Sequence, residues 1–143
     1  MAGGSVGAAR PVVLATLDVP VVDEAARVAV DAAVENGQPL VLVNVVARQF
    51  SPVTLVGWDT PSPPDVEESL RAPAALASQL GVRVERLRVR SPHPLDALLE
   101  VVAEQAPGLL VFGADRRRLR RGRYRRAARA IEQRAPCLVW LPG

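Results

Sequence analysis

The sequence predicts an α/β fold: one domain with a doubly wound, five-stranded parallel sheet in the order 3-2-1-4-5 and four helices, formed by a chain of 143 residues. Short apolar runs alternate with amphipathic stretches, which is the pattern of strands joined by helical crossovers. The first, second and fourth runs are almost wholly apolar, as strands covered on both faces are. The third run alternates between apolar and charged residues and therefore belongs at an edge of the sheet.

The first half of the chain supplies two strands and one helix before a long loop. Residues 11–18 form the first strand, which closes on Asp18. Apolar residues at helical spacing follow over 22–36, and an Asn-Gly pair ends this helix because both residues tolerate the left-handed conformation. Residues 40–46 form the second strand, and 47–64, rich in Pro, Ser and Gly, form a loop.

The second half alternates in the same way. Residues 65–80 are expected to be helical, with acids in the first turn, where the helix dipole favours them, and Gly81 after the end. Residues 82–90 form the alternating edge strand, with one break in the pattern at Arg86. The remaining expected elements are a helix at 94–105, a strand at 108–113, a helix at 123–134 and a last strand at 137–141.

In this topology the carboxyl ends of the first and fourth strands meet at the switch point of the sheet, where open α/β sheets bind ligands. Asp18 closes the first strand, and Gly113 closes the fourth. We therefore expect any ligand crevice to be lined by Asp18 and by the residues that follow Gly113.

Composition excludes several classes of protein. No apolar run approaches the roughly 20 residues that span a bilayer. Residues 1–10, expected to be a flexible N-terminus ahead of the domain at 11–143, lack the apolar core of a secretory signal. Cys137 is the only cysteine, so neither an internal disulfide nor a structural zinc site can form. These observations predict a cytoplasmic protein with no membrane partner.

No catalytic constellation is recognisable. His93, the only histidine, stands between two prolines without a metal-ligating neighbour and is interpreted as a surface turn residue. Cys137 follows a proline at the start of the last strand, which predicts a core position and low reactivity. The motifs of serine hydrolases, zinc proteases and P-loop proteins are absent. The sequence therefore predicts no enzyme activity and no metal site.

Arginine is concentrated in one segment. Residues 116–134 hold ten of the 18 basic residues, all arginine, opposed only by Glu132. An even spread would put about 2.4 in such a window. Ten positive charges against one negative give the segment +9, so the rest of the chain carries −6 of the total of +3. One face of the protein should therefore attract anions.

The last helix has an apolar stripe that must face the core, which turns its arginines toward solvent. These arginines are either a solvated face or an anion site, because guanidinium groups match phosphate and carboxylate geometry. An anionic small molecule or a protein partner fits the second interpretation. Nucleic acid is less favoured, since Tyr124 alone could stack on a base and no DNA- or RNA-binding motif is present. The stripe consists of Tyr124, Ala127, Ala128, Ile131 and Ala135.

Four features over residues 11–142 carry a family resemblance: an Asp that closes the first strand, the second strand LVLVNVV, the helix and strand LDALLEVVAEQAPGLLVFG after a Pro-containing turn, and the terminal APCLVWL. In these features the chain resembles the universal stress protein family. The resemblance implies a doubly wound domain of about this length that serves as a non-catalytic binding or regulatory module in the stress response. It also implies a homodimer through the last strand, which is common in the family. Some members bind ATP and others do not.

ATP-binding members of that family show the pattern G-x2-G-x9-G-[ST] after the fourth strand. Gly113 matches the first glycine, but Arg116 and Arg126 stand at the second and third, and Ala127 stands at the hydroxyl position. Counting backward from Ala-Pro-Cys, with one deletion, instead places Arg125 and Arg126 at the Gly-Ser pair. Glycine is needed where the backbone approaches a phosphate closely, so both alignments predict a lost or impaired ATP site.

Asp18 matches a second part of the family site. The resemblance suggests that its carboxylate accepts a hydrogen bond from an adenine amino group; alternatively, it satisfies backbone donors at the strand end. No cofactor is expected to be obligatory, and ATP or another adenine nucleotide is the candidate ligand. The alternative function is arginine-dependent binding of a nucleotide, polyphosphate or nucleic acid at the crevice. The candidate binding residues are Asp18, Gly113, Arg116, Arg125 and Arg126.

Overall fold

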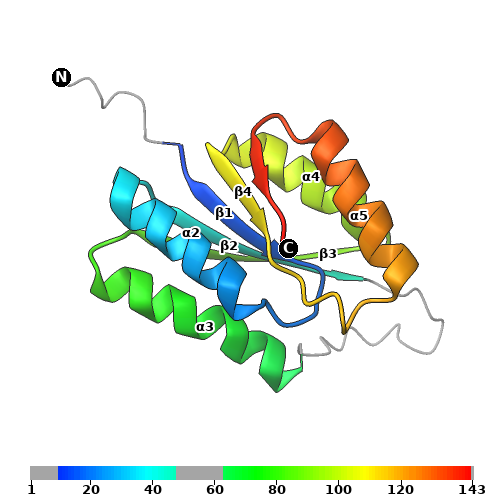
Figure 1. The fold of residues 1–143 in the computed structure, drawn as a ribbon, viewed down its shortest axis with the longest axis horizontal. Coiled ribbons are helices and arrows are strands. Elements are labelled where there is room, and N and C mark those ends of the chain that lie inside the picture. Colours follow the sequence, from blue (N-terminus) through cyan, green and yellow to red (C-terminus); the bar gives the residue numbers. More distant parts are fainter. Residues whose placement is uncertain (1–9, 48–62, 143) are drawn as a thin grey trace.

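The computed structural model describes residues 10–47 and 63–142. Within these ranges strands and helices alternate, and five parallel strands form one sheet in the order β3-β2-β1-β4-β5 (Figure 1). The fold class and the strand order predicted from the sequence are confirmed. The elements are β1 (Val12–Thr16), α2 (Asp23–Asn36), β2 (Leu40–Ala47), α3 (Pro64–Gln79), β3 (Val84–Ser91), α4 (Pro94–Gln105), β4 (Leu109–Phe112), α5 (Arg121–Arg134) and β5 (Leu138–Trp140).

Two of the predicted segments lie largely outside the described residues. They are the loop at 47–64, of which residues 48–62 are not described, and the N-terminus at 1–10, of which only Arg10 is described. Arg10 is exposed and leads directly into the domain.

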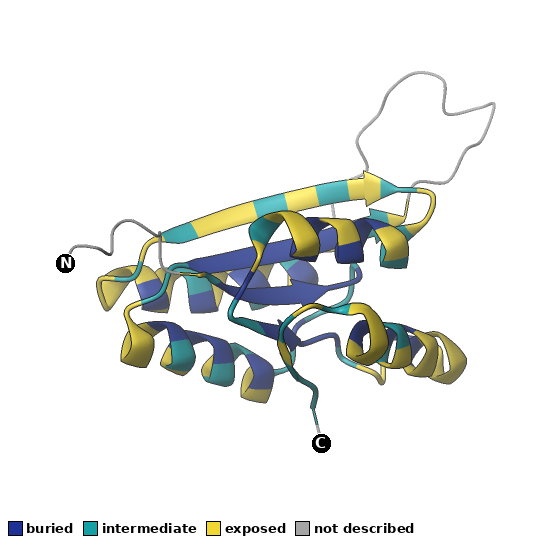
Figure 2. Ribbon diagram, turned by 90° about the horizontal axis from the view of Figure 1, so that it is seen from above, coloured by how far each residue is buried: buried dark blue, intermediate teal, exposed yellow. Residues whose placement is uncertain are grey.

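Helices cover both faces of the sheet (Figure 1). On one face α2 and α3 pack over alternate residues of the central strands, such as Leu14 and Leu42. On the other face α4 and α5 pack over their neighbours, such as Val13 and Phe112. Figure 2 shows the buried central strands lying between helical layers that are exposed on their outer sides. β1 is buried at every position because it lies between two strands and two layers of helices.

The two edges of the sheet differ. β3 alternates between exposed and half-buried residues (Figure 2) except at Glu85 and Arg86, which are both exposed, as the sequence pattern with its break at Arg86 predicted for an edge strand. At the other edge β5 pairs only with β4, and Leu138 is 75% exposed there. None of the helices in the described ranges is long and apolar enough to cross a membrane.

Candidate functional site

The segments that follow β1 and β4 meet at the carboxyl edge of the sheet. The Val22 N–H donates to the Gly113 carbonyl at 2.9 Å, and the Asp115 N–H donates to the Pro20 carbonyl at 2.9 Å. Between these two bonds, Val21 and Ala114 form an antiparallel bridge. The switch point therefore brings together the two segments expected there, and at this point they contact each other directly.

Gly113 fits this contact because it has no side chain. A β-carbon at this position would lie 2.8 Å from Cγ1 of Val21, 2.9 Å from Cβ of Ala25 and 3.1 Å from Cδ1 of Leu14. Real β-carbons essentially never approach other atoms this closely, and the obstructing atoms belong to buried, well-packed side chains. Packing within the protein is thus sufficient to account for the glycine.

Asp18 is held by a buried asparagine from the neighbouring strand. Its N–H donates to Asn44 Oδ1 at 2.8 Å, and Asn44 Nδ2 donates to Asp18 Oδ1 at 3.4 Å. Asp18 has a φ of 57°, in the left-handed region that aspartate tolerates better than most residues. Nearby, the Thr16 hydroxyl donates to the Val19 carbonyl at 2.6 Å. These bonds fix the turn that follows β1.

Asn44 was not among the predicted site residues. Its side chain is 3% exposed, and it is one of only two buried polar residues among those that the structure describes. The available signal was its position: a polar residue inside the otherwise apolar run LVLVNVV. A buried amide needs partners, and the turn at Asp18 supplies them.

The loop after β4 is held by acidic residues. The Arg117 backbone N–H donates to Asp115 Oδ1 at 3.0 Å, and its guanidinium Nε lies 3.2 Å from the same oxygen. The hydrogen bond from Arg117 holds the pKa of the Asp115 carboxyl below its usual value, against the opposing effect of burial. Arg118 pairs with Asp65 in the first turn of α3 at 2.7 Å, which lowers the pKa of Asp65. Leu119, 7% exposed, anchors the loop in the core.

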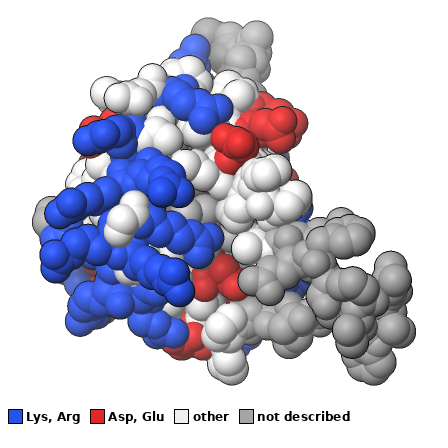
Figure 3. All heavy atoms as spheres, turned by 90° about the vertical axis from the view of Figure 1, so that its right-hand side faces the viewer, with Lys and Arg blue, Asp and Glu red and all other residues white. Residues whose placement is uncertain are grey.

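Helix α5 begins at Arg121, so Arg125 and Arg126 lie in its second turn. Their backbone N–H groups are therefore within the helix rather than free at its start. Both side chains are exposed, whereas Ala127 is 1% exposed and faces the core. Figure 3 shows the arginines gathered on the side of the molecule where α5 lies.

Arg116 lies against Tyr124, a buried residue near the start of the same helix. Its guanidinium carbon is 5.9 Å from the centre of the Tyr124 ring, which itself packs at 5.8 Å from the Phe112 ring. Tyr124 is 8% exposed, and its hydroxyl has no hydrogen-bond partner among the described residues. Burial raises the pKa of this hydroxyl. The tyrosine is thus part of the core and does not offer its ring to a ligand.

The structure brings together only some of the predicted site residues. Asp18 and Gly113 belong to the two segments that meet at the switch point, and Arg116 follows in the same loop as Gly113. Arg125 and Arg126 lie on the solvent side of α5 and form no side-chain bond to the described residues of that edge.

A hollow of about 240 Å³ lies beside Asn44, on the face of the sheet that α3 covers. Its apolar wall is formed by Leu42, Leu70 and Leu87, and Arg86 and Glu67 form an ion pair at 3.0 Å among its polar lining residues. Asn44, which lines this hollow, also bonds to Asp18, for which the family resemblance suggests a contact with adenine. Its size and mixed lining suit a small, flat group better than a whole nucleotide.

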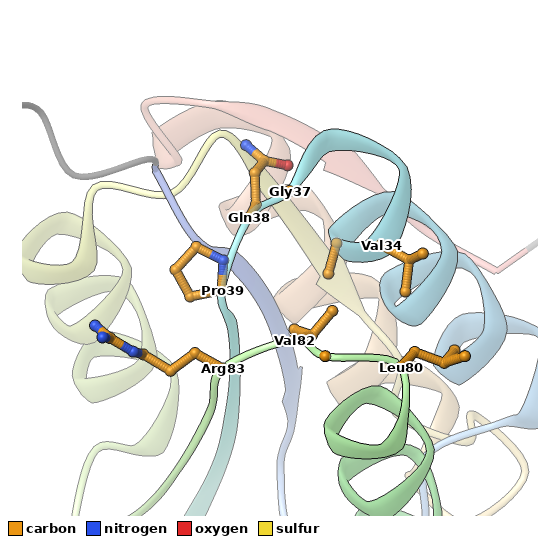
Figure 4. A pocket seen from close by; sticks show the side chains of 9 residues that line it. Val34, Gly37, Gln38, Pro39, Leu80, Val82 and Arg83 are labelled. Atoms are coloured by element: carbon orange, nitrogen blue, oxygen red, sulfur yellow. The ribbon is translucent and has the colours of Figure 1, made fainter. Parts of the chain in front are cut away.

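A second hollow, of about 330 Å³, lies at the amino ends of β2 and β3, at the opposite end of the strands from Asp18. Val34, Leu80 and Val82 form its apolar side, while the side chains of Gln38 and Arg83 extend away from them (Figure 4). Ligand sites combine apolar walls with convergent polar groups, and this hollow has only the walls.

The described residues offer no metal centre, because no group of three or more His, Cys, Asp or Glu side chains lies together within them. His93 is exposed at the start of α4, as predicted. Cys137 is half-buried, rather than a full core residue, and burial raises the pKa of its thiol, which makes the thiolate scarce at neutral pH.

Solved universal stress protein structures share this fold. An Archaeoglobus fulgidus protein in complex with dAMP is 20% identical, with a TM-score of 0.63, over 94% of this chain and 98% of its own. A universal stress protein in complex with cAMP is also 20% identical, with a TM-score of 0.64, over 93% of this chain and 97% of its own. An Arabidopsis thaliana family protein with AMP bound is 16% identical, with a TM-score of 0.52, over 92% of this chain and 90% of its own.

The comparison with curated proteins found no match. The sequence model of the universal stress protein family, in contrast, matches residues 9–141, which is nearly the whole chain and includes every described helix and strand. With the parallel sheet in the order β3-β2-β1-β4-β5, this match places the chain in the universal stress protein family.

Proposed function

We propose that this chain is a non-catalytic binding or regulatory module of the stress response, with an impaired site for the phosphates of an adenine nucleotide. The main support is the position of residues 125–127. In both alignments with the family motif, the final glycine and the hydroxyl position after it fall inside α5 rather than in the loop before it.

Phosphate binding by a glycine-rich loop depends on free backbone N–H groups that the ligand can approach. At Arg125 and Arg126 these groups belong to the second turn of α5, where they bond to carbonyls of the preceding turn. A hydroxyl at position 127 would point into the core, where Ala127 is 1% exposed. Two arginines of the loop before α5 are also already paired within the protein, Arg117 with Asp115 and Arg118 with Asp65.

The base end of the family site is better preserved. Asp18 Oδ1 is engaged by Asn44, and its other carboxylate oxygen has no bond within the described residues, so it is able to accept one from an adenine amino group. Solved relatives hold dAMP, cAMP and AMP, which all contain adenine. We therefore expect residual recognition of the base and little gain from the phosphates.

The absence of catalysis is the second part of the proposal. Among the described residues, the one histidine is exposed in a turn and the one cysteine has a raised pKa, and neither side chain bonds to a described group that would activate it. A binding role fits this chemistry better than turnover.

Self-association through β5 is the third part. β5 is an edge strand with an unpaired side, and an isologous partner strand would cover both that side and Leu138. The alternative function, arginine-dependent binding at the crevice, has weaker support, because Arg117 and Arg118 are paired with carboxylates there.

Isothermal calorimetry in low-phosphate buffer tests the proposal. We expect ATP to bind more weakly than micromolar, with little difference between ATP and adenosine, and Asp18→Ala to abolish what binding there is. Micromolar ATP affinity that depends on the triphosphate would overturn the impaired phosphate site. Sustained release of phosphate from ATP, proportional to protein concentration, would overturn the non-catalytic assignment.

A further inference from the structure

We propose that the solvent face of α5 binds the phosphate backbone of double-helical nucleic acid without reading its sequence. This inference goes beyond the proposed function, since it concerns a different surface and a different ligand. The surface, which we call the α5 arginine face, consists of Arg120, Arg121, Arg123, Arg125, Arg126 and Arg129.

These six arginines carry charge that the rest of the described chain does not neutralise. All ten arginines between positions 116 and 134 are exposed. Arg117, Arg118 and Arg134 pair with Asp115, Asp65 and Asp96. Arg116 lies over the Tyr124 ring. The six residues of the α5 arginine face form no ion pair or hydrogen bond with any side chain that the structure describes.

The arrangement disfavours α5 as an isolated helix. The first turns of α2, α3 and α4 carry acids, which stabilise the positive end of the helix dipole, but the first turn of α5 carries Arg121 and Arg123. Arg121, Arg125 and Arg129 also follow one another at a spacing of four residues, where like charges repel. A face that served only for solubility would mix the two signs. A bound polyanion would remove the repulsion.

The α5 arginine face is broad and extended. Opposite the buried Tyr124, Ala127 and Ile131, its arginines lie on both flanks of the helix as well as on its crest, and Glu132 is the one acid of α5. Figure 3 shows a broad patch of basic side chains on the side of the molecule where α5 lies. Neither of the two described hollows lies in it. The surface therefore suits an extended chain of anions better than a single small one.

The other side chains nearby favour a duplex over other polyanions. Single strands are held largely by stacking on aromatic rings, but Tyr124, the aromatic residue of α5, is only 8% exposed. Insertion into an anionic membrane would need exposed apolar side chains on this face. Those with large exposure in the described ranges are Val34, Leu76, Leu80 and Leu138, which belong to α2, α3 or its C-cap, and β5.

A duplex presents a phosphate charge about every 3.4 Å along each strand, and its major groove admits a helix. The residues that carry the α5 arginine face, 120–129, extend over roughly 15 Å, which corresponds to about four phosphates of each strand. Arginines on the two flanks of α5 would reach the two strands that border the groove. Guanidinium groups bind phosphates in pairs of parallel hydrogen bonds, which adds geometry to the charge.

Fluorescence anisotropy with a labelled DNA duplex of about 20 base pairs and mixed sequence tests the proposal across a range of salt concentrations. We expect saturable binding that does not depend on sequence and weakens steeply with salt, with a slope in log affinity against log salt near −5 if all six arginines engage phosphates. The variant Arg121→Gln, Arg125→Gln, Arg126→Gln, Arg129→Gln should bind at least about tenfold more weakly, with a slope reduced by roughly one for each lost contact.

A matched variant separates the α5 arginine face from net charge. Arg10→Gln, Arg27→Gln, Arg71→Gln, Arg83→Gln removes the same number of exposed charges from other parts of the surface, and duplex affinity should stay within about threefold of wild type. Lysine at the four α5 positions should preserve the salt slope, because phosphate contacts require charge above all. Circular dichroism should show full helix content in every variant, since all substituted positions are exposed.

The proposal fails if wild type shows no saturable binding at low salt, or if the two glutamine variants lose equal affinity. Tighter binding of a single strand, of linear polyphosphate or of polyglutamate than of the duplex would assign the face to that polyanion instead. None of these outcomes would alter the calorimetric test of the nucleotide site, which uses a different ligand and a different residue.

Discussion

Val21 and Gly113 pack so closely that a β-carbon added to Gly113 would lie 2.8 Å from Cγ1 of Val21. The two residues belong to different segments, one after β1 and the other after β4, and the bridge between Val21 and Ala114 holds them in register. Glycine at the end of β4 thus has a structural role that does not depend on any ligand.

Gly113→Ala should therefore lower the free energy of unfolding by about 1–3 kcal/mol, the usual cost of overpacking a core. Chemical denaturation measures it. Gly122→Ala is the control, because a β-carbon there meets nothing within 4 Å and the residue lies in the first turn of α5, so stability should hold or rise slightly. Gly113→Ala should also cost less in a Val21→Ala background. A fully stable Gly113→Ala protein would contradict the packing argument.

Asn44→Ala should cost about 1–3 kcal/mol of folding stability, because it leaves the Asp18 N–H without its acceptor in a poorly solvated place. The exposed Asn36, whose side chain donates to the Ala32 carbonyl, provides the comparison: Asn36→Ala should change stability by no more than about 0.5 kcal/mol. Equal effects of the two substitutions on denaturant midpoints would show that the Asp18–Asn44 contact contributes nothing.

The pKa of Asp115 lies below the ordinary aspartate value of 3.8, chiefly because of its hydrogen bond from Arg117. A depressed folded-state pKa contributes stability that is present above the unfolded value and is lost as pH falls through the folded value. The stability difference between wild type and Asp115→Asn should thus shrink as pH falls below 3.8.

Carboxyl NMR titration checks this directly. The Asp115 pKa should move back toward 3.8 in Arg117→Gln, and it should stay depressed in Arg129→Gln, which removes an arginine from the opposite end of the segment. A carboxyl that titrates at its ordinary value in wild type would contradict the ion pair.

If the chain dimerises through β5, Leu138→Arg should convert a dimer into a monomer in sedimentation velocity, because it places a charge at the proposed interface. Leu80→Arg is the matched control: Leu80 is 55% exposed but lies at the end of α3, away from that edge. Monomeric wild type at high micromolar concentration, or dissociation by Leu80→Arg alone, would argue against pairing through β5.

The fold was predictable because its patterns are local. The apolar runs give the central strands, the alternation in VRVERLRVR gives the edge strand, and the helix predicted at 94–105 has the same bounds in the structure. The largest helix-start difference is at α5, which begins at Arg121 rather than at 123. The apolar stripe starts only at Tyr124, so the sequence pattern gave no signal that the helix begins as early as Arg121.

The site was predictable only in part. Topology alone places Asp18 and Gly113 at the same edge, as the sequence analysis expected. The Asp18–Asn44 pair joins residues 26 positions apart, and no local pattern specifies which side chain reaches a buried amide. Whether the predicted residues bind a nucleotide stays a prediction, since their side chains here bond to protein groups or face solvent.

The charge pattern of α5 also bears on how the native state opens. A helix without an N-cap hydrogen bond, with repelling neighbours and three buried side chains, holds its backbone hydrogen bonds mainly through packing. Its amide protons should exchange with deuterium sooner than those of α4, which buries five side chains. Because α5 connects β4 to β5, this opening would release the terminal strand while the other four strands stay protected.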